Sequence, residues 1–264
     1  MVKNVKLKMD DELELDVNMS EMDLEITEMM RMLRMPRMRE AYMLMVGSDE
    51  LAKLSSSEVL HRLLSEQLSR RMENATAKRI KLSNIWEPEA RLALLPEHSI
   101  MVKANELNQY AKFNFMNAGV PLKIFVGDQY ERNYLASAFG AQACIDRIKT
   151  FYIKFEHLID PDLRTEFERD TVTIDMLRDI PMLIIDDWLC CKADEKNTQI
   201  LKSILEYRST PGKGTILATC YREEAWEHNL TGPANAIRTF KRWFKNGISM
   251  EVKGAEAIQP EVMA

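Results

Sequence analysis

The chain has 264 residues, of which 46% are hydrophobic and 29% are charged, and its formal net charge is −5 at pH 7. This length and apolar content allow a sizeable core and predict one main domain accompanied by a smaller one. No apolar run approaches the ~20 residues that span a bilayer, and no stretch has the pattern of a secretory signal. We therefore expect a soluble, cytoplasmic protein without membrane segments.

The N-terminal segment, residues 1–28, is acidic, with Asp and Glu concentrated between Asp10 and Glu28. Repulsion between like charges favours a solvated chain over a packed one. The sequence therefore predicts a partly disordered N-terminal extension.

Residues 29–83 are expected to form a small helical domain that binds DNA or a partner. Apolar spacing predicts a helix over residues 20–46 that breaks at Pro36. Its methionines are explained by core packing or by a surface that adapts to a partner. A second helix is predicted from the run SSSE, where a serine caps it and Glu58 lies in the first turn, to about Leu82.

The second predicted helix is basic. Its candidate DNA-binding residues are Arg62, Arg70, Arg71, Lys78, Arg79 and Lys81. A basic cluster in an acidic chain indicates contact with phosphates, although a solvated helix face gives the same pattern.

Pro88 and Pro96 mark a linker over residues 84–100, and the pattern then changes to alternating strands and helices. Strands are predicted at 122–126, 149–155, 182–185, 215–219 and 248–252, and helices at about 132–146, 162–178, 194–208 and 233–245. This order predicts an α/β domain over residues 101–254, with a mostly parallel sheet between two helical layers. A short tail, residues 255–264, follows.

Two acids, Asp186 and Asp187, directly follow the apolar run MLII. Ligands of open parallel sheets bind at the carboxyl ends of the strands. Four apolar residues followed by two acids form a Walker B pattern, in which the first acid reaches Mg²⁺ and the second orients a water. The alternative is a pair of acids that caps the next turn.

Several segments together carry a resemblance to a known family. They are LIIDDW at the two acids, MLRMPRMREAY, the basic helix from LSSSEVL to KLSNI, YLASAFGAQACI, and the segment from TILATCYREEAW to ISMEVKG. Over about residues 29–254 the chain resembles the IstB-type transposition helpers, AAA+ ATPases related to bacterial helicase loaders. The resemblance implies an AAA+ P-loop NTPase-like fold and ATP with Mg²⁺ as cofactors. It also implies that the partners are duplex DNA, a transposase and further copies of the chain.

The phosphate loop departs from the family pattern G-x-x-G-x-G-K-[ST], in which glycine backbone groups and a lysine hold the phosphates. Here the stretch reads GDQYERNY, from Gly127 to Tyr134. Counting forward from Gly127 places Asn133 at the lysine position. Counting back from Tyr134 places Arg132 at the lysine position and Asn133 at the Ser/Thr position, and we prefer this count because it keeps a cation.

Loss of the glycines opposes phosphate binding, because side chains with Cβ atoms strain such a loop. Asp128 and Glu131 would also repel a triphosphate. Glu131 could itself take the place of the anion at the helix N-terminus. We therefore expect ATP hydrolysis to be weak or lost, the alternative being that Arg132 does the work of the lysine.

The resemblance assigns the remaining site residues. Gly127, Arg132, Asn133 and Asp186 are the candidate cofactor-binding residues, and Asp186 is also the candidate metal ligand. Asp187, Arg242 and Thr219 are the candidate catalytic residues. Thr219, or else Cys220, stands at the sensor position, and Arg242 at the place of an arginine finger, the alternative for it being a solvated side chain of a basic helix.

Three functions follow from these patterns. The first is a DNA-binding AAA+ helper that forms oligomers on DNA and activates or delivers a transposase. The second is an adaptor that works without nucleotide and binds a protein through residues 20–46, and the third is a protein similar to helicase loaders.

Overall fold

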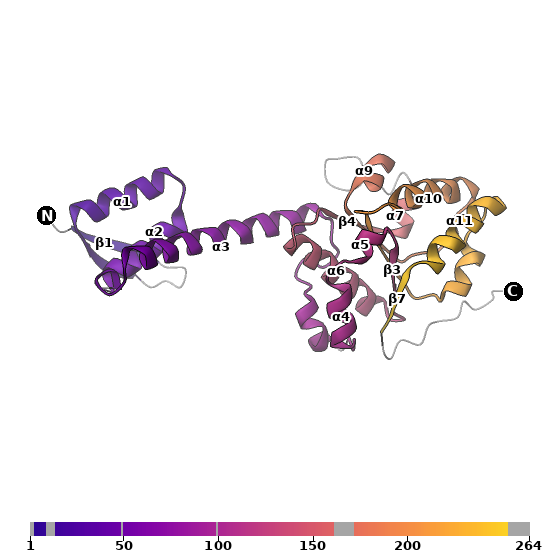
Figure 1. Cartoon of the computed structure of the whole chain (residues 1–264), viewed down its shortest axis with the longest axis horizontal. Helices are drawn as coiled ribbons and strands as arrows, with labels where there is room; N and C mark the ends of the chain where they lie inside the picture. The colour runs from indigo at the N-terminus through magenta and orange to yellow at the C-terminus, as the bar shows by residue number, and fades with distance from the viewer. Residues whose placement is uncertain (1–2, 9–13, 49, 99, 161–171, 253–264) are drawn as a thin grey trace. The chain divides into compact units, whose positions relative to one another are not determined.

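A computed structural model of the chain describes residues 3–8, 14–48, 50–98, 100–160 and 172–252. It divides into two compact units, Met1–Ala77 and Lys78–Ala264 (Figure 1). Each unit has buried hydrophobic clusters of its own. Among the described helices, none has the length and apolar character needed to cross a bilayer.

The first unit combines a hairpin with helices. Its elements are β1 (Lys3–Lys8), β2 (Glu14–Met19), α1 (Glu21–Met32), α2 (Pro36–Gly47), a 3₁₀ turn η1 (Glu50–Ala52) and most of α3 (Ser56–Leu82). The helices begin as predicted, with α2 starting at Pro36 and the Ser55 side chain accepting a hydrogen bond from Glu58 N at the start of α3. A helix of 27 residues then connects the two units along the chain.

The hairpin differs from the expected N-terminal extension. β1 and β2 pair antiparallel, and the register places Lys6 opposite Asp16 and Lys8 opposite Glu14. Polar and apolar residues alternate in both segments, which is typical of strands. The prediction of an extension gave more weight to the acidic composition of residues 10–28, which include β2. Residues 1–2 and 9–13 of the expected extension lie outside the described residues.

The second unit is an α/β domain. Before the sheet lie η2 (Leu92–His98), α4 (Ala104–Tyr110) and α5 (Phe115–Ala118). The strands are β3 (Pro121–Phe125), β4 (Thr150–Lys154), β5 (Met182–Asp186), β6 (Gly214–Thr219) and β7 (Ile248–Glu251). The helices between them are α6 (Gln129–Ile145), α7 (Phe155–Ile159), α9 (Ile174–Asp179), α10 (Glu195–Arg208), the 3₁₀ helix η3 (Glu223–Asn229) and α11 (Ala234–Lys245).

All neighbouring strands of this sheet pair parallel, in the order β4-β5-β6-β3-β7. Alternate residues of β5 face opposite clusters. Ile184 packs in the cluster that includes α6, whereas Leu183 and Ile185 pack in the cluster that includes α10 and α11. Helices therefore cover both faces, which confirms the predicted three-layer α/β fold.

All of the predicted strands of this sheet are present, within a few residues of their expected bounds. The helix expected at 162–178 is described only over α9, since residues 161–171 lie outside the described residues. The expected tail, residues 255–264, lies outside them as well.

Candidate functional site at the carboxyl edge of the sheet

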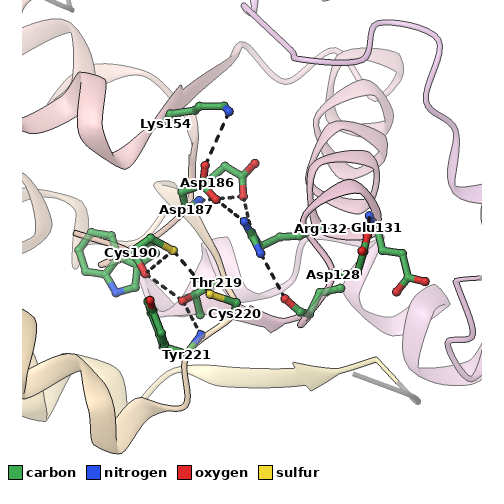
Figure 2. A network of polar contacts seen from close by, with 12 residues as sticks. Asp128, Glu131, Arg132, Lys154, Asp186, Asp187, Cys190, Thr219, Cys220 and Tyr221 are labelled. Carbon is green, nitrogen blue, oxygen red and sulfur yellow. Dashed lines mark hydrogen bonds and ion pairs between the residues drawn. The ribbon is translucent and has the colours of Figure 1, made fainter. Parts of the chain in front are cut away.

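The site forms where β3 and β5 end and α6 begins. β5 ends at Asp186, and the connection from β3 to α6 consists only of residues 126–128. Arg132 therefore lies in the first turns of α6 and not in a loop. From there its side chain extends toward Asp186 and Asp187 (Figure 2).

Arg132 is the centre of the network. Only 3% of the residue is exposed, although it carries a guanidinium. Its Nη2 contacts Asp187 Oδ1, and its Nε lies 3.4 Å from Asp186 Oδ1. Burial would lower the pKa of Arg132, but the charges of Asp187 and Asp186 outweigh it and raise that pKa. The arginine thus stays charged and compensates both carboxylates.

Asp186 is fully buried and its oxygens are already hydrogen-bonded. The Tyr152 hydroxyl donates to Oδ2, and the backbone N–H of Asp187 donates to Oδ1 at 2.8 Å. The Asn133 amide, oriented with its nitrogen toward the carboxylate, donates to Oδ2 at 2.7 Å. Burial, followed by the charge of Asp187, raises the pKa of Asp186, while Tyr152 and Arg132 oppose that rise.

Asp187 completes the network from a turn just after β5. Its backbone has φ of 53°, in the left-handed region that a residue with a Cβ seldom adopts. Lys154 Nζ lies 3.7 Å from its Oδ2 and also lies over the ring of Trp86, 4.1 Å from the ring centroid. Asp187 therefore contacts two cations of the same chain, Arg132 and Lys154.

The start of α6 is capped from within the chain. Asp128 Oδ1 accepts a hydrogen bond from Glu131 N at 2.9 Å, so the Asp128 carboxylate occupies the place where a helix N-terminus binds an anion. The expectation that Glu131 fills this place is wrong. Burial, with the charge of Asp128, raises the pKa of Glu131. Gly127 adopts no left-handed conformation here.

Thr219 lies at the same edge of the sheet, but its hydroxyl forms hydrogen bonds with main-chain atoms. Its hydroxyl donates to Trp188 O at 2.9 Å and accepts from Tyr221 N at 3.1 Å. The residue is fully buried. These contacts hold the segment after β5 against the end of β6.

Within one chain, Arg242 lies away from this site. It lies on α11 and lines a cleft of about 240 Å³ together with Trp243 and with Val120, the residue before β3. That cleft lies at the amino end of β3, the opposite edge of the sheet from Asp186.

The candidate DNA-binding residues of α3 differ in their surroundings. Arg62 pairs with Glu50 at 2.7 Å and Arg70 with Glu73 at 3.5 Å, both on the surface. Arg71, Lys78 and Lys81 are exposed. Arg79 is half-buried and donates to Cys144 O at 2.7 Å, which gives it a structural role.

The sequence patterns did not predict that Tyr152 and Lys154 belong to this network, because their strand, β4, carries no motif. The pairing of β4 with β5 provides the signal. It places Tyr152 beside Ile184 and Lys154 beside Asp186. In the described part of the chain, no group of three or more His, Cys, Asp or Glu side chains could hold a metal ion.

Comparison with known proteins identifies a family. The model of the family described as IstB-like ATP binding protein matches residues 28–256. No curated protein matches the chain significantly.

Several solved structures are similar at low identity. A DNA replication initiation factor has 19% identity and a TM-score of 0.47, with 63% of this chain and 50% of that chain covered. DnaI has 16% identity and a TM-score of 0.48, with coverages of 62% and 91%. AMPPCP-bound DnaA from Aquifex aeolicus has 19% identity and a TM-score of 0.47, with coverages of 64% and 51%. The chain thus spans about half the length of the first and third of these.

Proposed function

This chain belongs to the family of IstB-like ATP-binding proteins, and from that membership we propose that it is a DNA-binding AAA+ helper that works without bound ATP. The observation that carries the proposal is the contact of Arg132 with Asp186 and Asp187. In this reading, the two acids that would serve Mg²⁺ and water are compensated by an arginine of the same chain.

The residues present do not fit Mg²⁺ and a triphosphate. A connection of three residues between β3 and α6 is too short to wrap phosphates with backbone N–H groups. The N-terminus of α6 is capped by Asp128. A metal ion at Asp186 would have to displace hydrogen bonds from Tyr152, Asn133 or the main chain.

Separating Arg132 from Asp186 and Asp187 would cost a large part of the free energy that nucleotide binding normally provides. Separating one partner of a buried ion pair costs about 3–5 kcal/mol. Since each 1.4 kcal/mol is a factor of ten, a nucleotide that displaced Arg132 would bind roughly 100- to 4,000-fold more weakly. We therefore propose that the chain neither binds nor hydrolyses ATP at concentrations that saturate an intact phosphate loop.

Calorimetric titration with ATP and Mg²⁺, together with an ATPase assay, tests this directly. We expect no heat of binding in the micromolar range and no turnover. A variant in which the stretch from Gly127 to Tyr134 is replaced by a glycine-rich loop ending in Gly-Lys-Thr serves as the comparison, with circular dichroism confirming that it folds. Micromolar affinity of the natural chain, with turnover that Asp187→Asn abolishes, would refute the proposal.

We propose duplex DNA as a partner because two helices present basic surfaces. On α3, Arg71, Lys78 and Lys81 are exposed. On α11, the exposed side chains include Arg238, Lys241, Arg242 and Lys245, and of these only Lys241 has a described ion pair, with Glu227. Such surfaces favour sequence-independent contacts with phosphates.

Salt-dependent binding to duplex DNA of random sequence tests this part. Affinity should fall steeply with salt, and a variant with Arg71, Lys78 and Lys81 changed to Glu should bind more weakly with a shallower slope. The matched control changes Glu21, Glu25 and Glu66, exposed acids of the first unit, to Gln. Equal affinity at low and high salt for the natural chain would exclude phosphate contacts as the source of binding.

A second candidate, an adaptor for a protein partner, is favoured by the surface of α1. Met22, Met29 and Met32 of α1, and Leu33 directly after it, are each more than half exposed, and flexible apolar side chains suit varied partners. Light scattering with DNA and ATP, separately and together, distinguishes the candidates. A helper of the family type should form larger assemblies on DNA, whereas an adaptor should keep its size. The partner protein, a transposase or a helicase, belongs to this proposal and is open to the same test with each purified partner.

A further inference from the structure

A pair of cysteines lies at the same edge of the sheet and has no part in the proposed function. Cys190 follows β5 and Cys220 follows β6, and these strands are neighbours. The two Sγ atoms are 3.8 Å apart (Figure 2). Both residues are partly exposed.

The other two cysteines differ from this pair. Cys144 is buried in α6, and its thiol pKa is raised, mainly by burial. Cys191 is exposed, and no hydrogen bond to another sulfur is described for it. In the described part of the chain, Cys190 and Cys220 are thus the thiols whose sulfur atoms are in contact.

We propose that Cys190 and Cys220 are an oxidative modification site, which a hydroperoxide converts into an intramolecular disulfide. The thiolate of Cys220 attacks the peroxide, the O–O bond breaks, and Cys220 becomes a sulfenic acid while hydroxide takes up a proton and leaves as water. Cys190 Sγ then attacks Cys220 Sγ, the S–O bond breaks, and a second water leaves with the proton of Cys190. Two thiols and one hydrogen peroxide thus give one disulfide and two waters.

The surroundings select Cys220 as the first nucleophile. A hydrogen bond from Cys190 and the charge of Arg132 lower the pKa of Cys220, against opposing effects of burial and of Asp187. The same contact, with burial, raises the pKa of Cys190. Tyr221 also lies near the pair, and its pKa is raised first by burial and then by the charges of Cys220 and Cys190, while Lys154 contacts Asp187. Cys220 therefore reacts as the thiolate and Cys190 resolves the intermediate.

The proposed disulfide lies close to Asp187. The sulfur atoms must approach from 3.8 Å to about 2.05 Å. Cys190 N donates to Asp187 O at 3.0 Å, so both residues belong to one turn. The disulfide would therefore form at the turn that presents Asp187 to Arg132.

Peptide mapping of the full chain after treatment with hydrogen peroxide tests the proposal. Free thiols are blocked by alkylation, the chain is digested without reduction, and the peptides are identified by mass spectrometry. We expect a linked pair of peptides containing Cys190 and Cys220, lower in mass by two hydrogens than the two reduced peptides together, and full reversal of the link by dithiothreitol. A Cys191→Ser variant, the matched control, should give the same link.

A second variant reveals the order of the steps. Cys190→Ser removes the resolving thiol, so a cyclic 1,3-diketone probe should label Cys220 as a sulfenic acid, whereas Cys220→Ser should give no label at Cys190. The proposal is overturned if both thiols are alkylated after oxidation. It is also overturned if the link joins Cys191 instead, or if Cys190→Ser and Cys220→Ser are labelled equally.

Discussion

At the scale of single residues, the feature to explain is a charged guanidinium buried beside two carboxylates. Arg132, Asp186 and Asp187 leave water together, which is costly unless their hydrogen bonds are satisfied. Tyr152 and the main chain donate hydrogen bonds to Asp186, and Lys154 forms an ion pair with Asp187, whereas Arg132 Nε makes no hydrogen bond within the described residues. Each member of the network therefore depends on the others.

This dependence predicts the effect of removing the arginine. Arg132→Met should lower the free energy of unfolding by about 3–5 kcal/mol, because Asp186 is left buried without a cation and Asp187 keeps only its ion pair with Lys154. Chemical denaturation followed by tryptophan fluorescence measures the change. Arg238→Met, an exposed arginine of the same unit, is the matched control and should change stability by less than about 0.5 kcal/mol.

A second change tests the cause of that loss. Adding Asp187→Asn to Arg132→Met removes one of the uncompensated charges, so part of the lost stability should return. If the double variant is as unstable as the sum of the two single variants, the ion pair is not what Arg132 contributes.

The pH dependence of thiol reactivity is the next expectation at this scale. The thiolate is the reactive form, so alkylation accelerates as pH rises through the thiol pKa. The pKa of the Cys220 thiol is lowered, mainly by its hydrogen bond with Cys190. The pKa of the Cys191 thiol is raised, mainly by partial burial and then by the charges of Glu156 and Asp187. Cys220 should therefore reach half of its maximal alkylation rate at a lower pH than Cys191, measured by quantitative mass spectrometry from pH 5 to 10. Identical midpoints would contradict the assignment of Cys220 as nucleophile.

At the scale of elements, the start of α6 decides what the edge of the sheet can bind. A phosphate loop gives a helix N-terminus an external anion, whereas here Asp128 supplies an internal one. α10 is capped in the same way by Asp194, whose side chain accepts from Asn197 N at 2.7 Å. The start of α6 thus has the form of an ordinary capped helix.

Capping by Asp128 predicts that substitutions at Asp128 and at Glu131 change the stability of the protein differently. Asp128→Ala should lower the free energy of unfolding by about 1 kcal/mol, the usual effect of losing a cap. Glu131→Gln should be neutral or slightly stabilising at pH 7. Its raised pKa means that ionisation disfavours the folded state as pH rises above the unfolded pKa. Thermal denaturation of both variants checks this, and a larger loss for Glu131→Gln would show that Glu131 caps α6 after all.

The comparison of sequence and structure is also clearest at this scale. The strands of the parallel sheet were predictable because buried strands are short continuous apolar runs, and Asp186 and Asp187 because they directly follow one. Counting back along the loop placed Arg132 at the lysine position, and in the structure its side chain contacts these acids. Tyr152 and Lys154 were not predictable, since their roles depend on β4 lying beside β5. The contact of Cys190 with Cys220, rather than with its neighbour Cys191, likewise depends on strand order.

At the scale of the whole molecule, the chain consists of two units with separate cores. In the first unit, Met43 and Met45 are almost fully buried, in the clusters that β2, α1, α2 and α3 form. In the second, the aromatic rings of Trp188, Trp226 and Phe244 pack edge to face. All four tryptophans of the chain lie in the second unit, so their fluorescence reports on that unit alone.

Separate cores predict separate responses to a core substitution. Met43→Ala should destabilise the first unit by about 2–5 kcal/mol, the usual range for removing a buried methionine side chain. Denaturant unfolding followed by far-ultraviolet circular dichroism should then show an early transition, while the transition followed by tryptophan fluorescence stays at its original midpoint. The matched substitution in the second unit, Leu201→Ala on α10, should shift the fluorescence transition instead. A single transition that moves equally in both signals with either substitution would mean that the units unfold as one, because non-coincident probes are the mark of separate cooperative units.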